Sequence, residues 1–190
     1  MSEKPTVVLM NSDELFSLRP SKKIDRWLFR GELREAKVTK RNPSHSAAVS
    51  NLVYVLSSWL RGQPQPRGKV YSGEAYFRVR KDPDTNVGID VALSTPEQAA
   101  AAGKKASYVD GPPVLAAEVL SPNDKHRDVV EAVEEYLECG VRLVWVVDPY
   151  TETVTAHRPG REPELFTRSD ELTGDPVLPG FRCRVAEIFE

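Results

Sequence analysis

The chain has 190 residues, and its 26 Lys and Arg side chains nearly balance its 28 Asp and Glu side chains, for a formal net charge of −2. A hydrophobic fraction of 40% and a charged fraction of 28% are typical of a globular domain, and they exclude a disordered acidic chain, a collagen-like fibre and a polybasic arm. This balance creates no whole-protein field that would attract nucleic acid, so any nucleic-acid surface must be a local patch.

The N-terminal half predicts alternating helices and strands. Residues 1–10 are expected to be a flexible lead-in, and the capping pattern at Asn11 or Ser12, with Glu14 in the first turn, predicts a short helix. The longest helical periodicity follows Asn42, with Ser44 as the expected cap, and Gly62 ends it. Strands are expected at 26–33 with a turn at Gly31, at 37–40, 68–71, 74–80 and 88–93.

The C-terminal half contains a strand–helix–strand pattern. Apolar segments at 114–120 and 143–147 flank an amphipathic helix at 128–139, and so short a connection predicts a right-handed crossover between parallel strands. Residues 95–108 are either a short helix or a surface loop. The remaining segments predict antiparallel hairpins at 153–157, 164–167 and 177–181, and a docked helix at 185–189. The predicted class is α/β (α+β) with a mixed sheet, in one domain over 11–190.

Glu118 is the most informative single residue, because it is the one charged residue in the apolar segment 114–120. An isolated carboxylate in such a strand is costly unless it is paired, protonated or bound to a metal ion. A salt bridge to a buried arginine, or exposure at the end of the strand, would also accommodate the charge.

Asp90 repeats this pattern in the segment 88–93. Strand alternation places Asp90 on the face opposite to its apolar neighbours Ile89 and Val91. Mg²⁺ is typically held by one or two carboxylates, with water and phosphate oxygens as its other ligands. Asp90 and Glu118 on adjacent strands would suit such an ion.

The remaining candidates are one histidine and three basic clusters. His45 could bind a phosphate, ligate a metal or hydrogen-bond the adjacent hairpin, and the hairpin contact is favoured. If these clusters contact a bound nucleic acid, the affinity for that nucleic acid should fall steeply as the salt concentration rises. The alternative is that they are ordinary surface charge. The clusters are Lys37, Lys40 and Arg41; Lys104 and Lys105; and Lys125, His126 and Arg127.

Several short motifs follow one another along the chain. They are Arg30-Gly-Glu-Leu, His45, Gly73-Glu74, Glu118-Val-Leu-Ser-Pro, Arg127-Asp128, Tyr136, Gly140-Val, Trp145-Val-Val-Asp-Pro and Pro176-Val-Leu-Pro-Gly-Phe. In this order they resemble the Uma-two family of restriction endonucleases, a branch of the PD-(D/E)XK nuclease superfamily. The resemblance covers roughly residues 11–190.

The resemblance implies a restriction-endonuclease-like core with an added antiparallel hairpin region. It also implies a hydrolase of DNA phosphodiester bonds that depends on Mg²⁺ or Mn²⁺. The acidic pair that holds the metal maps to Asp90 and Glu118, and a further catalytic acid maps to Glu32. Glu74 and His45 are implied neighbours of the site.

The sequence departs from the family pattern at its lysine. The superfamily places a lysine two residues after the glutamate, where this chain has Leu120, and the Uma-two branch places it on the following helix, where this chain has Ala132. Lys125 could substitute, and Lys104 and Lys105 could reach over the site, although a solvated surface role is favoured for each. The proline that usually precedes the aspartate is also missing, because Ile89 stands there.

Three functional hypotheses follow. The chain is a working endonuclease, or a catalytically degenerate nuclease fold that binds nucleic acid or protein, or an unrelated α/β protein in which Glu118 is ion-paired. DNA is the expected partner and a homodimer is compatible with the exposed edge strands.

The short apolar runs exclude a membrane helix, and two cysteines form neither a disulfide framework nor a thiolate zinc site, so a cytoplasmic location is expected.

Overall fold

The computed structural model describes residues 9–38 and 42–190, so the lead-in predicted for 1–10 lies almost entirely outside the described residues. The helices are α1 (Ser12–Ser17), α2 (Pro43–Arg61), α3 (Pro96–Ala101), α4 (His126–Glu138) and α5 (Ala186–Phe189). The strands are β1 (Ile24–Phe29), β2 (Glu32–Lys37), β3 (Val70–Arg80), β4 (Thr85–Leu93), β5 (Val109–Asp110), β6 (Leu115–Val119), β7 (Leu143–Asp148), β8 (Thr153–His157), β9 (Glu164–Phe166), β10 (Glu171–Thr173) and β11 (Arg182–Arg184).

A mixed sheet forms the centre of the molecule. Within the described residues it has nine strands in the order β2-β1-β4-β6-β7-β8-β9, and β3 pairs with both β4 and β5. The two apolar strands β6 and β7 pair in parallel, as the strand–helix–strand pattern predicts, and α4 connects them. The other neighbouring pairs are antiparallel except β3 with β5, so the predicted mixed class is confirmed.

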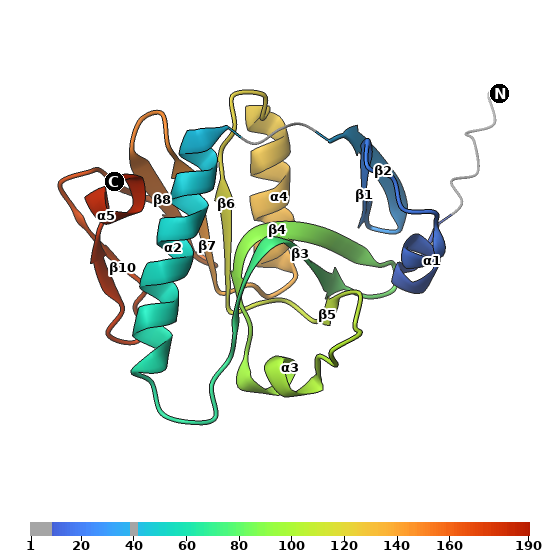
Figure 1. The fold of residues 1–190 in the computed structure, drawn as a ribbon, viewed down its shortest axis with the longest axis horizontal. Coiled ribbons are helices and arrows are strands. Elements are labelled where there is room, and N and C mark those ends of the chain that lie inside the picture. The colour runs from blue at the N-terminus through green and yellow to red at the C-terminus, as the bar shows by residue number, and fades with distance from the viewer. Residues whose placement is uncertain (1–8, 39–41) are drawn as a thin grey trace.

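Helices cover both faces of this sheet (Figure 1). On one face, Leu52 and Leu56 of α2 are fully buried in a cluster that includes Leu115 and Trp145 of the sheet. On the other face, Val133 and Tyr136 of α4 join a second cluster of buried side chains. Such double coverage explains why β6 and β7 read as nearly continuous apolar runs in the sequence.

The structure corrects two predicted boundaries in the N-terminal half. The cap of α2 is Asn42 rather than Ser44, because the Asn42 side chain accepts a hydrogen bond from the His45 backbone N–H at 2.8 Å. The strand expected to resume at 37–40 already begins at Glu32, immediately after the Arg30-Gly31 turn, since the β1–β2 register pairs Phe29 with Glu32. Residues 39 and 40 of that expectation lie outside the described residues.

Two further strand predictions are wrong. Segments 68–71 and 74–80 are not separate, because β3 runs continuously through a register shift between Ser72 and Ala75. Residues 177–181 do not form a strand. Leu178 and Phe181 are instead fully buried against the α2 face in a turn, and the hairpin is made by β10 and β11 on either side of it.

The sheet opens along one edge of β4. This edge pairs with β6 through Val91–Leu93 and with β1 at Asn86. The opposite edge of β4 is paired with β3 along its length. Residues 87–90 lie between the segments paired with β6 and β1. Ile89 packs with Phe77 in the α4-side cluster, whereas Val91 packs in the α2-side cluster, so the strict alternation expected across 88–93 breaks at this opening.

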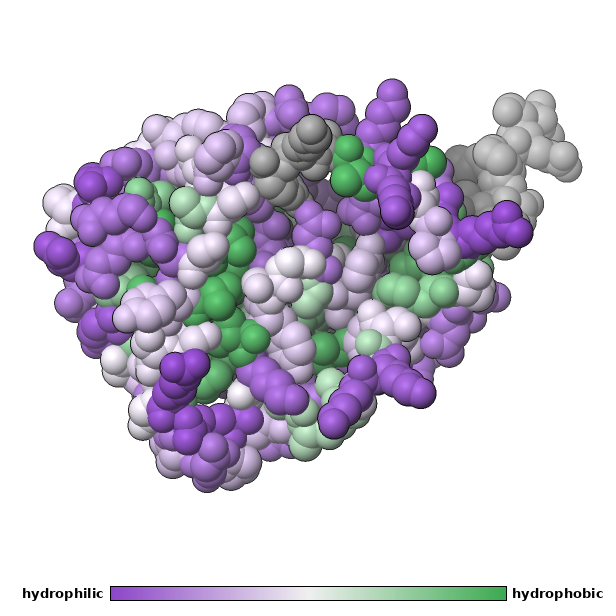
Figure 2. Space-filling model, viewed as in Figure 1, coloured by the Kyte–Doolittle hydropathy of each residue, from purple (hydrophilic) through white to green (hydrophobic). Residues whose placement is uncertain are grey.

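Figure 2 shows polar and charged side chains over most of one face of the molecule, with hydrophobic side chains gathered in smaller patches. Across residues 9–38 and 42–190, no helix is both long enough and apolar enough to cross a bilayer.

Candidate functional site

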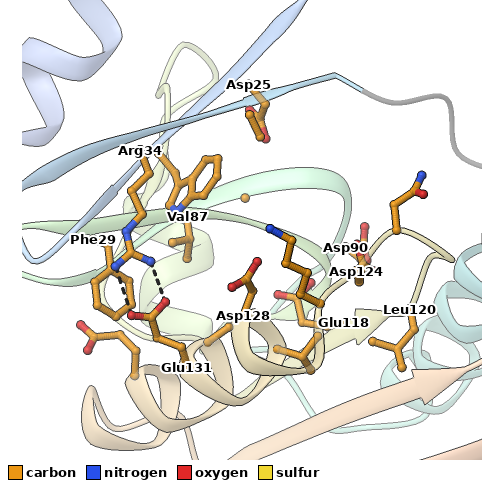
Figure 3. Close-up of a pocket in the computed structure, with 18 of the residues that line it drawn as sticks. Asp25, Phe29, Arg34, Val87, Asp90, Glu118, Leu120, Asp124, Asp128 and Glu131 are labelled. Carbon is orange, nitrogen blue, oxygen red and sulfur yellow. Dashed lines mark hydrogen bonds and ion pairs between the residues drawn. The ribbon is translucent and has the colours of Figure 1, made fainter.

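A cleft of about 660 Å³ fills the opening in the sheet. Its floor comes from Val87, Gly88 and Asp90 of β4 together with Glu118 of β6. The β1–β2 hairpin makes one wall, and α4 with the preceding turn makes the other (Figure 3). The cleft therefore exists because β1 and β6 separate along the same edge of β4.

Asp90 and Glu118 meet where β4 and β6 diverge. The last ladder pair is Val91 with Ala117, so Asp90 and Glu118 are the next residues of the two strands. Asp90 is 6% exposed, and its Oδ2 accepts a hydrogen bond from the Val119 backbone N–H at 3.0 Å. This bond takes the place of a ladder bond and fixes the carboxylate at the fork. Figure 3 shows both carboxylates in the cleft.

His45 comes to this fork from the first turn of α2. Its Nε2 lies 3.3 Å from Asp90 Oδ2, and the ring is 3% exposed. Within the described residues, the ring therefore contacts Asp90 of β4, the strand that pairs with β3. The Asn42 cap, which binds the His45 N–H, sets the position of this turn.

Tyr136 forms a hydrogen bond with Glu118. Its hydroxyl donates a hydrogen bond to Glu118 Oε1 at 2.7 Å from the buried face of α4. Burial and the nearby Glu118 and Asp90 carboxylates raise the pKa of Tyr136 well above its usual value. The phenol is therefore a permanent donor that holds one oxygen of Glu118.

A buried ion cluster ties α4 to the strands beside the cleft. Glu135 is 2% exposed and accepts hydrogen bonds from Arg30, Arg80 and Thr85. Burial alone would raise the pKa of Glu135, but the bonds from Arg80, Thr85 and Arg30 outweigh it and lower the pKa to about 2. The carboxylate is therefore ionised at neutral pH and anchors the hairpin turn.

A second contact bridges the two walls of the cleft. Arg34 of β2 donates two hydrogen bonds to Glu131 of α4, at 2.7 and 3.1 Å, and its guanidinium lies 4.0 Å from the centre of the Phe29 ring. This bidentate pair joins the two walls directly (Figure 3).

Three other predicted residues have distinct positions. Lys125 lines the cleft from the N-terminal end of α4. Glu74 lies on β3 next to the Gly88 of the floor, because a Cβ built on Gly88 would be 3.2 Å from the Glu74 Cβ. Glu32 is exposed at the hairpin turn, opposite Phe29, and is not among the residues that line the cleft.

The predicted nucleic-acid contacts do not gather at the cleft. Lys104 and Lys105 are exposed on the segment after α3, and the residues that follow them, Ala106–Tyr108, line a shallow depression beside α1 instead. The Arg127 side chain is 91% exposed and pairs with Asp128 at 3.7 Å. Lys37 does line the cleft, whereas Lys40 and Arg41 lie outside the described residues.

Most of the residues that form the cleft walls were not predicted from the sequence. The missed lining residues include Asp25, Trp27, Arg34 and Asp124. Alternation along β1 is the one available signal, since Asp25 and Trp27 are two positions apart and share a face. Which face of the β1–β2 hairpin lies toward α4 depends on contacts between residues about one hundred positions apart in the chain, such as Arg34 with Glu131.

The charge of the cleft limits its chemistry. Among the described residues, eight carboxylate and three basic side chains line it. A polyanion is repelled by such a surface unless cations offset the charge. Within the same residues, no three His, Cys, Asp or Glu side chains are grouped to hold a metal, so a zinc-type site of three protein ligands is not formed. A pair of carboxylates is the donor set present.

Comparisons with known proteins agree with this fold. A crystal structure described as a putative nuclease belonging to DUF820 from Anabaena variabilis ATCC 29413 superposes with a TM-score of 0.75, at 19% identity, over 95% of this chain and 97% of that chain. This likeness shows a shared fold. No curated protein matches the chain. A family model described as "Uma2: Putative restriction endonuclease" matches residues 13–186, nearly the whole chain. The chain therefore belongs to the Uma2 family and has the mixed-sheet fold expected from its sequence motifs.

Proposed function

We propose that this protein is a divalent-metal-dependent nuclease that hydrolyses DNA phosphodiester bonds in the cleft between the β1–β2 hairpin and α4. The observation that carries the proposal is the fork at which Asp90 and Glu118 follow the last ladder pair of two adjacent strands and line one cleft. Membership of the Uma2 family supports the reaction class.

The residues present fit Mg²⁺ or Mn²⁺. Both ions prefer oxygen ligands, and Mg²⁺ is commonly held by one or two carboxylates with water and phosphate completing the shell. Asp90 and Glu118 would be the protein ligands. When bound, such an ion supplies charge neutralisation at the phosphate and a more acidic water.

The surrounding residues hold these carboxylates in place. The Val119 N–H and His45 fix Asp90, and Tyr136 fixes Glu118, so neither carboxylate needs to reorganise when substrate arrives. Lys125 is the lysine placed best for the phosphate, because it lines the cleft from the N-terminal end of α4, the helix that follows the Glu118 strand. Its ammonium group would stabilise negative charge that develops on the phosphate, a role worth about a hundredfold or more in rate.

Plasmid nicking tests the proposal. The wild type is expected to nick DNA with Mg²⁺ or Mn²⁺ and to lose activity in EDTA, and Asp90→Ala and Glu118→Ala should be inactive. Lys125→Ala should lose about a hundredfold in rate, while Lys104→Ala, an exposed lysine away from the cleft, serves as the matched control and should match the wild type. Nicking that survives EDTA or the loss of either carboxylate would contradict the proposal.

One observation favours a second candidate function. Leu120 and Ala132, which stand at the two positions where the family pattern has its lysine, both line the cleft. A catalytically degenerate protein that binds nucleic acid would also show this arrangement. It predicts that the wild type binds DNA with a strong salt dependence but nicks no plasmid with any divalent ion.

A further inference from the structure

The hairpin wall of the cleft carries an aromatic side chain, Trp27, that has no ring or side-chain hydrogen-bond partner among the described residues. Asp25, Trp27 and Phe29 alternate along β1 and all line the cleft. The Phe29 ring is covered by the Arg34 guanidinium at 4.0 Å. Within the described residues, the half-buried Trp27 makes no ring–ring, cation–π or side-chain hydrogen-bond contact. The indole is therefore available to a ligand in the cleft.

Asp25 lies two residues away and presents a fixed acceptor. Its Oδ1 accepts hydrogen bonds from the Tyr76 hydroxyl and the Arg26 backbone N–H, both at 2.9 Å, so the carboxylate is oriented. Its Oδ2 accepts no hydrogen bond from any described residue. Figure 3 shows Asp25 on the hairpin side of the cleft, across from Asp90 and Glu118. A carboxylate only accepts hydrogen bonds, so a ligand here must bring a donor.

An unpaired nucleobase combines the two properties that this wall requires. Every base has a π-face that stacks on an aromatic side chain, and the amino groups of cytosine and adenine donate from the edge of the ring. In a duplex, both faces and the pairing edge are already occupied, so only an unpaired or extruded base offers them. The cleft volume of about 660 Å³ lies in the range of sites that hold one small molecule.

We propose that Trp27 and Asp25 form a subsite that binds one unpaired, amino-bearing nucleobase across the cleft from the Asp90–Glu118 fork. The substrate is then single-stranded or locally unpaired nucleic acid, and cytosine is preferred to thymine because thymine has a carbonyl oxygen where cytosine has its amino group. This subsite deepens the nuclease function proposed above and rests on it.

Equilibrium binding of labelled oligonucleotides tests the subsite. Oligo(dC), oligo(dT) and a duplex of the same length are titrated with the full chain in Ca²⁺, and fluorescence anisotropy is measured. The wild type should bind oligo(dC) most tightly and the duplex most weakly. Trp27→Ala should weaken oligo(dC) binding between about fivefold and a hundredfold, and Trp27→Phe should weaken it less. Asp25→Asn, which keeps the Oδ1 acceptor, should abolish the preference for oligo(dC) over oligo(dT).

Trp59→Phe is the matched control, because Trp59 lies on α2, bonds the Pro179 carbonyl and does not line the cleft. It should bind like the wild type. Wild-type affinity in folded Trp27→Ala, or a wild type that prefers the duplex, would overturn the subsite while metal-dependent nicking kept the nuclease function intact. A wild type that binds none of the three nucleic acids would overturn both proposals.

Discussion

Replacing Glu135 by glutamine should lower the free energy of unfolding by about 3 kcal/mol at neutral pH. The Glu135 side chain is 1% exposed, and the Arg80 guanidinium donates to Oε1 at 2.8 Å while the Arg30 guanidinium donates to Oε2 at 2.9 Å. The Thr85 hydroxyl adds a third bond at 2.7 Å. Glutamine keeps the shape of the side chain but removes the charge that these groups stabilise.

The magnitude follows from the pKa of Glu135. Burial opposes ionisation, but the bonds from Arg80, Thr85 and Arg30 prevail and lower the pKa from 4.5 to about 2. Each pKa unit is worth about 1.4 kcal/mol, which gives the figure of about 3 kcal/mol. Because the folded-state pKa is lowered, this stabilisation is fully present above pH 4.5 and is lost as the pH falls from 4.5 toward 2.

Urea unfolding followed by tryptophan fluorescence measures the effect near neutral pH and at several values below pH 4.5. The difference in the free energy of unfolding between the wild type and Glu135→Gln should become smaller as the pH falls. Glu138→Gln is the matched control, since Glu138 contacts the same two arginines but its side chain is 58% exposed, and its cost should stay below about 1 kcal/mol. A Glu135→Gln variant as stable as the control, or a gap that does not change with pH, would refute the reasoning.

Two further substitutions have defined outcomes. Tyr136→Phe removes the hydroxyl that holds Glu118, so Mn²⁺ affinity measured by calorimetry should fall about tenfold or more, and unchanged affinity would show that Tyr136 does not position this carboxylate. Ser12→Ala removes a buried hydroxyl that donates to Asp84 at 2.6 Å, so the free energy of unfolding in urea should fall by about 1.5–3 kcal/mol; a loss below about 0.5 kcal/mol would contradict the importance of this contact.

Local patterns predicted much of the fold. The cap at Asn11 starts α1 with both bonds of a capping box, and the apolar segments around α4 form the parallel pair β6 and β7. The same patterns identified Asp90 and Glu118 as carboxylates out of place in apolar strands, and the structure puts both in one cleft. These features were accessible because each depends on neighbours within a few residues or on strand burial.

The rest of the site depends on distant contacts. Glu135 looks like part of the polar face of an amphipathic helix, yet it is buried. Arg30 from the β1–β2 turn and Arg80 from the end of β3 pair with it, and both are more than fifty residues away in the chain. The β1–β2 hairpin forms a wall because Arg34 meets Glu131 and Arg30 meets Glu135. Hydrophobic periodicity contains no information about such charge pairs, so Asp25 and the other wall residues were not identified.

The central claim is that Asp90 and Glu118 share one divalent ion, and crystals of the full chain soaked in Mn²⁺ test it most directly. An anomalous difference map should show a peak at the β4–β6 fork, with an oxygen of each carboxylate roughly 2.1 Å from the ion, the distance typical of Mg²⁺. The peak should vanish in Asp90→Asn crystals. A map with no peak at the fork, or with Mn²⁺ held by only one of the two carboxylates, would contradict the claim.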